Sequence, residues 1–166
     1  MKKCIVFAAG FLFLSGLLTA AGYVNANDLE KGTFTIEVKL EDNFALHGTA
    51  EKAIIVDAAD EGKTAPDGEV FTQRINTKGS GNMAQRSVSF PVKAGEKVTI
   101  YGHSSSKTDT RTMLIVDSDG QTVFSMDVGP YATADVAIGS FNAPADGTLY
   151  AWSKSSGIYI YCIKVE

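Results

Sequence analysis

Lysines that stand beside glycine and serine turns are the residues of this chain with the plainest chemistry, which is the binding of anions. Lys78, Lys107 and Lys154 each occupy such a position. A lysine or arginine pairs with a carboxylate through charge-assisted hydrogen bonds. One exposed pair contributes only about 0–1 kcal/mol, so useful affinity requires several pairs together. The three lysines therefore predict a surface for an acidic polymer, if the fold brings them to one face.

Two arginines and two aromatic residues extend this set of candidate ligand-binding residues. Arg111 stands at the start of a predicted strand, where it can also pair with a carboxylate or cap loop carbonyls, and the pattern does not separate these roles for Arg74. Aromatic rings stack on the C–H faces of sugars. Tyr101 and Trp152 are the aromatic candidates, although most aromatic residues in alternating strands belong to the core. Trp152 lies between two small residues and has the best prospect of partial exposure.

The sequence carries no recognisable set of catalytic residues. Its two histidines, His47 and His103, are not part of a cluster with metal-ligand spacing. Ser104 follows His103 directly, but adjacent residues of a strand point to opposite faces, which disfavours a Ser–His pair. No Gly-x-Ser-x-Gly motif is present. We therefore predict that the protein is not an enzyme.

The paired acids of Asp117-Ser-Asp-Gly120 invite a calcium interpretation, because carboxylates on a turn are oxygen ligands. A full calcium loop would continue to further ligands and a distant glutamate, which this segment lacks. A hairpin turn explains the segment better. We predict no cofactor and no metal site, while a structural calcium elsewhere in the chain stays open.

The sequence predicts that short β-strands position the candidate ligand-binding residues. Several runs alternate apolar and polar residues, such as Val88, Phe90 and Val92 on one face, and Gly, Asp and Ser turns separate the runs. The terminal run is apolar on both faces, which favours a central place in a sheet, and Asp60–Gly68 reads as a loop. The pattern predicts an all-β protein, a single-domain antiparallel β-sandwich or jelly roll. The predicted strands are Thr33–Leu40, Lys52–Ala58, Val70–Ile75, Arg86–Val92, Lys97–Tyr101, Arg111–Val116, Thr122–Met126, Asp135–Phe141, Thr148–Ser153 and Ile158–Val165.

The N-terminal segment has the layout of a secretory signal peptide. Lys2 and Lys3 precede an apolar run from Ile5 to Leu18, and small residues then lead to Ala26. The apolar run is short for a membrane span of about 20 residues. We expect residues 1–26 to be removed and residues 27–166 to form the domain. The protein would then be secreted, to the extracellular space or the periplasm, with no membrane partner.

The net charge limits the class of partner, and the cysteine content limits disulfide formation. The chain has 19 acidic and 15 basic residues, a net charge of −4, and loss of Lys2 and Lys3 would lower it by 2, to −6. A mildly acidic chain argues against a nucleic acid partner, although a local basic patch can still exist. After the expected cut one cysteine remains, Cys162, so no internal disulfide can form. Cys162 alternates with isoleucines and is expected to be a small buried hydrophobic residue.

Several motifs in the C-terminal half carry a resemblance to a known family. They are Phe71-Thr-Gln-Arg-Ile-Asn-Thr-Lys-Gly, Arg86-Ser-Val-Ser-Phe, Ser104-Ser-Ser-Lys, Arg111 with Asp119-Gly120, and Ser156-Gly-Ile-Tyr-Ile-Tyr-Cys-Ile-Lys-Val. The region from Glu69 to Glu166 resembles the small β-sandwich modules attached to bacterial pectate lyases. The pectin-binding family 77 carbohydrate-binding modules are the group it resembles. The most specific parts are the Arg-Ser-x-x-Phe strand and the closing Ser-Gly-Ile-x-Ile-Tyr strand.

This resemblance implies a non-catalytic module that binds de-esterified homogalacturonan, the acidic polymer of pectin, through surface lysines. Local pattern transfers that role to Lys78, Lys107 and Lys154. Two alternatives stay open: a structural or adhesion β-sandwich with a protein partner, and a module that binds neutral plant glycans through aromatic residues. Residues 27–68 are the part of the chain that the resemblance explains least.

Overall fold

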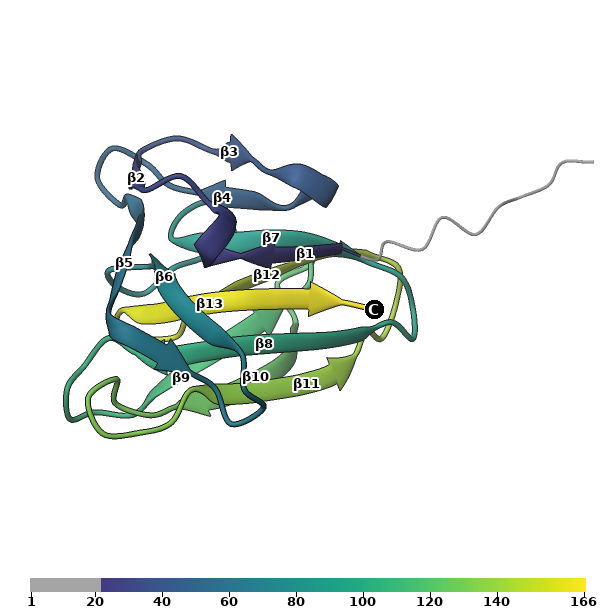
Figure 1. The fold of residues 1–166 in the computed structure, drawn as a ribbon. Helices are drawn as coiled ribbons and strands as arrows, with labels where there is room; N and C mark the ends of the chain where they lie inside the picture. The colour runs from purple at the N-terminus through teal and green to yellow at the C-terminus, as the bar shows by residue number, and fades with distance from the viewer. Residues whose placement is uncertain (1–21) are drawn as a thin grey trace, which may run out of the picture.

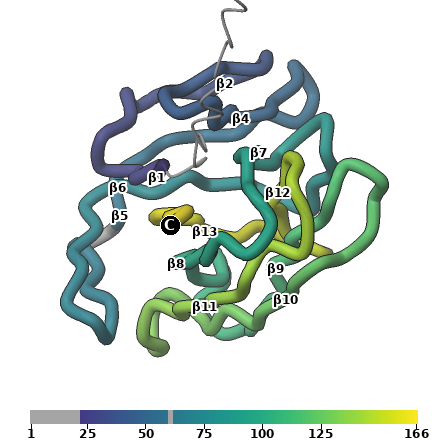
Figure 2. Tube along the Cα trace, turned by 90° about the vertical axis from the view of Figure 1, so that its right-hand side faces the viewer, coloured from purple at the N-terminus to yellow at the C-terminus, as the bar shows by residue number. Residues whose placement is uncertain are grey.

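The computed structural model describes residues 22–166, except for the side chains of residues 60 and 61, and shows an antiparallel β-sandwich (Figure 1). One sheet has seven strands in the order β11-β8-β13-β6-β5-β2, with β1 also paired to β13, and the other has six in the order β10-β9-β12-β7-β4-β3. Figure 2, seen from the end where the C-terminus lies, shows the two sheets as facing layers. The predicted fold class is therefore confirmed.

The strands are short and are separated by turns, as the sequence predicts. Two 3-10 turns, Ala26–Asp28 and Glu41–Asn43, interrupt the first part of the chain. The strands are β1 Gly22–Asn25, β2 Gly32–Phe34, β3 Val38–Lys39, β4 Ala45–His47, β5 Ile54–Thr64, β6 Val70–Asn76, β7 Ser87–Val92, β8 Lys97–Ser104, β9 Arg111–Val116, β10 Thr122–Val128, β11 Ala137–Asn142, β12 Gly147–Ser153 and β13 Ile158–Val165.

The main core lies between the two sheets and is built from alternate residues of each strand. Val88, Phe90 and Val92 of β7 all belong to it, and so do Ile158 and Ile160 of β13. The rings of Phe44 and Phe90 stack with centroids 5.8 Å apart. Burial of a large apolar side chain contributes about 1.5–3 kcal/mol, so this layer supplies the main stabilisation of a domain that has no disulfide among its described residues.

A second apolar cluster covers the opposite face of β13, which explains why this strand is apolar on both sides. Tyr159, Tyr161 and Cys162 belong to that cluster, beneath residues of the β5–β6 hairpin and of the chain before β11. The rings of Phe71 and Tyr161 stack with centroids 5.1 Å apart. The predicted central position of the last strand is confirmed. Cys162 is a buried free thiol, and its burial raises its pKa to about 12.

The N-terminal third differs most from the prediction. Thr33–Leu40 is not one strand but two, β2 and β3, with the 69% exposed Ile36 between them. The loop prediction for Asp60–Gly68 is wrong in its first half, since β5 continues to Thr64. A register shift between Ala58 and Lys63 lets this charged stretch stay in the β5–β6 ladder.

The fold also includes residues upstream of the expected domain boundary. β1 pairs with β13 from Gly22 opposite Val165 to Asn25 opposite Cys162. Ala26, which directly follows, is fully buried. A cut after Ala26 would therefore remove β1, so the position of the cut stays a prediction. Residues 1–21, with most of the expected signal peptide, lie outside the described residues. Among residues 22–166, no helix is long and apolar enough to cross a membrane.

Candidate ligand-binding surface

Three loops meet at the end of the sandwich where β13 begins, opposite the C-terminus (Figure 1). They are residues 77–86, 105–110 and 154–157, and backbone hydrogen bonds tie them together. The amides of Thr77 and Ser105 donate to carbonyls of Ile158 and Gly157, each over 3.1 Å, and the amide of Gly81 donates to the carbonyl of Ser153 over 3.2 Å. Backbone hydrogen bonds thus hold the three loops together as one surface.

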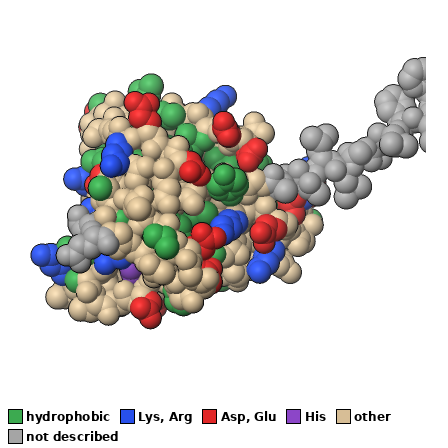
Figure 3. Space-filling view, in the orientation of Figure 1, with side chains coloured by type: hydrophobic (Ala, Val, Ile, Leu, Met, Phe, Trp, Pro, Cys, Tyr) green, Lys and Arg blue, Asp and Glu red, His purple; other side chains and the backbone are tan. Residues whose placement is uncertain are grey.

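This surface is basic on an otherwise acidic chain, and we call it the basic loop end. Residues 77–86, 105–111 and 154–157 contain one acid, Asp109, which accepts a 2.9 Å hydrogen bond from the Ser106 hydroxyl. Figure 3 shows Lys and Arg side chains along the corresponding edge of the molecule. The basic residues of the three segments are Lys78, Arg86, Lys107, Arg111 and Lys154. The three predicted lysines are therefore brought to one end of the fold, and all three are exposed.

Arg111 joins two of the loops from the first position of β9. Its Nη1 donates to the Ser105 hydroxyl over 2.6 Å and also to the carbonyl of Gly157. Gly157 has no room for a side chain, because a Cβ there would lie 2.7 Å from the Ser105 hydroxyl oxygen and 3.1 Å from the carbonyl carbon of Lys78. Arg111 therefore holds the loops in place, and it remains partly exposed to solvent.

Within the basic loop end, Arg86 combines an unfavourable backbone conformation with a buried side-chain donor that lacks an acceptor among the described residues. Its φ of 53° lies in the left-handed region, which costs an ordinary residue roughly 1–2 kcal/mol. Its Nε is buried and has no hydrogen-bond partner among the described residues, a condition that costs about 1–3 kcal/mol. Its Nη1 occupies the space that a side chain at Gly79 would need. The hydroxyl of Ser153, at the neighbouring end of β12, is also buried and has no hydrogen-bond partner in the described part of the chain.

Lys78 stands at the other end of the same loop and also has a left-handed backbone, with φ at 61°. Its amide donates to the side-chain oxygen of Asn76 over 3.0 Å, and this local bond supports the turn. A β-branched or bulky residue would not fit such a backbone without strain. The loop between β6 and β7 is thus bounded on both sides by a basic residue in a left-handed conformation.

Trp152 adjoins the basic loop end on the outer face of the six-stranded sheet. It pairs with Ser87 and Leu114 and is partly exposed, as expected. The 77–86 loop touches it, because a Cβ at Gly81 would lie 2.9 Å from Trp152 Cβ. Tyr150 follows on the same face of β12 and is also partly exposed. An aromatic surface therefore continues from the basic loops onto the sheet.

Two of the predicted ligand residues lie elsewhere, on the outer side of the seven-stranded sheet. Arg74 is buried, its Nε lies 2.6 Å from an Asp57 carboxylate oxygen, and its guanidinium sits 4.0 Å from the centre of the Tyr159 ring. Tyr101 is 3% exposed, and its hydroxyl donates to Asp67 over 2.7 Å. Burial and this bond raise the pKa of Tyr101 to about 12. The geometry gives both side chains a packing role, and their contact with a ligand stays untested.

A chain of polar contacts that sequence reasoning missed runs across the outer face of the six-stranded sheet. The Nδ1 of His47 lies 3.3 Å from a carboxylate oxygen of Glu37, and its Nε2 lies 2.8 Å from the Ser89 hydroxyl. Burial lowers the pKa of His47, while the charge of Glu37 opposes that shift. Glu37 and His47 belong to the β3–β4 hairpin, whose short second strand was not predicted, and Ser89 comes from the distant strand β7.

The contacts Glu37–His47–Ser89 have the same order as the catalytic triad of a hydrolase, but the groups around Ser89 do not form an active site. Ser89 lies within β7 and is paired with Ala45 on one side and Tyr150 on the other. The backbone amides around it serve these ladders, whereas a hydrolase needs free N–H groups aimed at the developing oxyanion. The arrangement therefore fits a set of polar contacts on a sheet surface better than a catalytic centre.

Among the side chains that the structure describes, which exclude those of residues 60 and 61, no group of three or more His, Cys, Asp or Glu residues could hold a metal ion. Asp117 and Asp119 form the predicted hairpin turn between β9 and β10. A carboxylate oxygen of Asp117 accepts from the amides of Asp119 and Gln121 over 3.0 and 2.8 Å. The turn is therefore stabilised by its own side chain, and calcium binding there has no support from this geometry.

Comparisons with known proteins bear on the fold. No protein-family model matches the chain. No curated protein matches it either. Among solved structures the chain is similar to the native structure of a family 35 carbohydrate-binding module from Clostridium thermocellum, at 18% identity and a TM-score of 0.50, over 87% of this chain and 96% of that one.

Two further solved structures are similar at lower scores. One is a family 6 carbohydrate-binding module studied by binding sub-site dissection, at 9% identity and a TM-score of 0.47, over 89% of this chain and 94% of that one. The other holds CBM51-2 in complex with GlcNAc and INT domains from Clostridium perfringens ZmpB, at 9% identity and a TM-score of 0.47, over 87% of this chain and 32% of that one. The likeness to the family 35 module, at 18% identity, bears on the β-sandwich fold alone, and the ligand must be argued from this chain's own surface.

Proposed function

We propose that this protein is a secreted, non-catalytic carbohydrate-binding module, and that its ligand is an acidic plant polysaccharide of the homogalacturonan type. The observation that carries the proposal is the basic loop end. Three separate loops and Arg111, the first residue of β9, bring five basic residues and one acid to one end of a chain whose net charge is −4. Such separation of charge creates a local positive field, which attracts an anionic ligand to that end.

The three exposed lysines suit a repeating array of carboxylates. Lys78, Lys107 and Lys154 lie on different loops, so a polymer chain could contact them one after another. Each lysine is a compact charge on a flexible stem, and each exposed pair contributes about 0–1 kcal/mol. The hydrogen bonds between the loops reduce the ordering cost that binding would otherwise carry. The expected result is modest affinity that depends on several pairs and on salt.

Trp152 adds an apolar surface at the margin of the same end. Sugar rings present C–H groups on one face, and an indole ring packs against them. A uronate residue has such a face and a carboxylate at its edge, so Trp152 and a neighbouring cation could hold one residue together. The contact between the 77–86 loop and Trp152 supports this pairing.

The second candidate function is binding of a neutral glycan on the outer face of the six-stranded sheet. The observation that favours it is the row of partly exposed Tyr150 and Trp152 beside the His47 ring, whose centroid lies 5.8 Å from that of Tyr150. In that case aromatic stacking would dominate and the lysines would contribute little.

Affinity gel electrophoresis of the exported domain against a polysaccharide panel tests the proposal. The panel contains low-ester pectin, high-ester pectin, xylan, xyloglucan and β-glucan, each at low and moderate salt. We expect retardation by low-ester pectin alone, relieved by salt because screening weakens exposed ion pairs. Retardation by a neutral glycan would favour Tyr150 and Trp152 instead. Retardation by no polysaccharide would reject both and point to a protein partner.

A further inference from the structure

Within this basic loop end, we infer that Arg86 is the residue that selects a carboxylate, as a planar fork and not merely as a positive charge. This inference rests on the proposed function and deepens it, because it assigns the recognition of the acid group to one side chain. Arg86 is not among the turn-edge lysines on which the proposed function depends. It directly precedes β7, next to the position where Ser87 pairs with Trp152.

The first support is the contrast between Arg86 and the other two arginines of the described chain. Arg74 is paired with Asp57 and covers Tyr159. Arg111 donates to Ser105 and Gly157. In Arg86, by contrast, the Nε is buried and has no acceptor among the described side chains. A guanidinium has five donors in one plane, so Arg86 has unused capacity for a planar acceptor.

The second support is the backbone of Arg86. A φ of 53° is a conformation that arginine rarely adopts, and structures retain such residues where the surroundings or the function require them. Glycine and asparagine accept a left-handed backbone more readily than arginine does. A left-handed backbone and an unpartnered buried donor therefore coincide on one residue, at the end of the molecule where the cations gather.

The third support is the loop that lies over Arg86. Gly79 and Gly81 both stand where a side chain would collide with Arg86, at its Nη1 and 2.5 Å from its carbonyl oxygen respectively. The two glycines therefore let the loop settle closely over the guanidinium. A small outward shift would open Nε and one Nη to a carboxylate, which accepts both in the side-on geometry that arginine favours.

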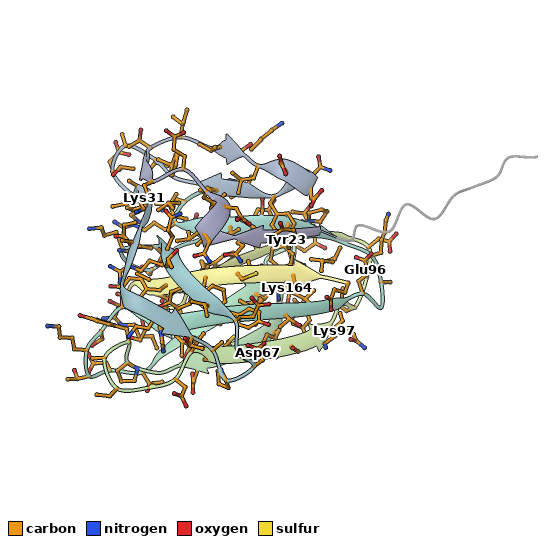
Figure 4. All side chains as sticks on the ribbon, viewed as in Figure 1. Tyr23, Lys31, Asp67, Glu96, Lys97 and Lys164 are labelled. Carbon is orange, nitrogen blue, oxygen red and sulfur yellow. The ribbon has the colours of Figure 1, made fainter. Side chains whose placement is uncertain are left out.

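The substitutions Arg86→Lys and Arg86→Asn distinguish a role of Arg86 in carboxylate recognition from a role in stabilising the fold. Lysine keeps the charge but removes the fork, whereas asparagine removes the charge and suits the left-handed backbone. Lys97→Ala is the matched control, because Lys97 is an exposed cation near the C-terminal end, opposite the basic loop end (Figure 4). Each protein is titrated calorimetrically with trigalacturonate, and its urea unfolding midpoint is measured.

We expect Arg86→Lys and Arg86→Asn each to weaken trigalacturonate binding at least tenfold, while Lys97→Ala stays within twofold of the wild type. The unfolding midpoint of Arg86→Asn should not fall below that of the wild type, because the backbone strain is relieved. If wild-type protein fails to bind trigalacturonate, the proposed function itself fails. If the wild type binds and Arg86→Lys binds within twofold of it, the inference is overturned while the proposed function stands. Should Arg86→Asn not fold, the lysine variant decides alone.

Discussion

The structure makes β1 part of the fold, and this can be tested by substitutions in a segment that the sequence assigns to a removable leader. Val24 is 4% exposed and belongs to the main core, whereas its neighbour Tyr23 is 56% exposed on the other side of the same strand. If β1 is retained in the exported protein, Val24→Ala must destabilise the domain and Tyr23→Ser must not. If the leader ends at Ala26, neither substitution can affect the exported protein.

The magnitude follows from the environment of Val24. Replacing valine by alanine removes two carbon groups at about 0.8 kcal/mol each, and the cavity left behind adds to that loss. The expected loss in free energy of unfolding is therefore about 2–3 kcal/mol. With a urea slope of about 1–3 kcal/mol per molar, the midpoint should fall by roughly 0.7–3 M. Tyr23→Ser should change the free energy by less than about 0.5 kcal/mol, as exposed substitutions do.

Urea unfolding of the exported protein provides the assay, with fluorescence of the single tryptophan, Trp152, as the signal. An intact-mass measurement on the same sample fixes its first residue. We expect the chain to begin at Gly22, because a cut after Ala21 keeps β1 and puts small residues, Thr19 and Ala21, at the positions that signal processing prefers. Equal midpoints for Val24→Ala and the wild type, with a first residue at Asn27, would refute the reasoning.

Three further outcomes are expected. Joint replacement of Lys78, Lys107 and Lys154 by alanine should weaken binding to low-ester pectin about tenfold to a hundredfold in gel retardation, because up to three exposed pairs of about 0–1 kcal/mol are lost; unchanged retardation would remove the lysines from the site. A fluorophosphonate should not label Ser89, since its β7 neighbours have their amides in sheet ladders; labelling of Ser89 would mean that the protein is an enzyme after all. Burial lowers the pKa of His103 below its unfolded value of about 6.5, so its contribution to stability is complete above that pH and is lost as pH falls. His103→Gln should therefore make the urea unfolding midpoint fall less between pH 7 and pH 5 than it does in the wild type. An equal fall in both proteins would contradict this.

Much of the fold could be predicted because its strands are regular and its turns are chemically explicit. From Val70 onward, alternation and Gly/Asp turns placed the strands within a few residues, and the apolar run of β13 correctly indicated a central strand. Upstream the signal is weaker. β4 has only three residues, and β1 is a four-residue segment that directly follows a leader-like run, so it looked like part of the leader. What makes β1 a strand is its pairing with β13, at the other end of the chain.

The candidate site shows the same division between local and long-range information. Glycine and serine neighbours identified Lys78, Lys107 and Lys154 as turn-edge cations, and the fold places their loops together. Tyr101 has the same local appearance as an exposed aromatic residue, but loops from distant parts of the chain cover it. The Glu37–His47 contact was not predicted either, because β4 has only three residues and the β3–β4 hairpin that brings the two together was missed. Local chemistry suggests candidates, and topology decides which of them share a surface.

The most direct test of the central claim is a calorimetric titration of the exported protein with oligogalacturonate in its free-acid and methyl-esterified forms, at 0.1 M and 1 M salt. Screening shortens from about 10 Å to about 3 Å between these conditions. Because ion pairs carry the proposed recognition, we predict binding to the free acid at 0.1 M, marked weakening at 1 M, and no measurable binding to the ester. Equal affinity for the acid and the ester, or an affinity that salt leaves unchanged, would contradict the account.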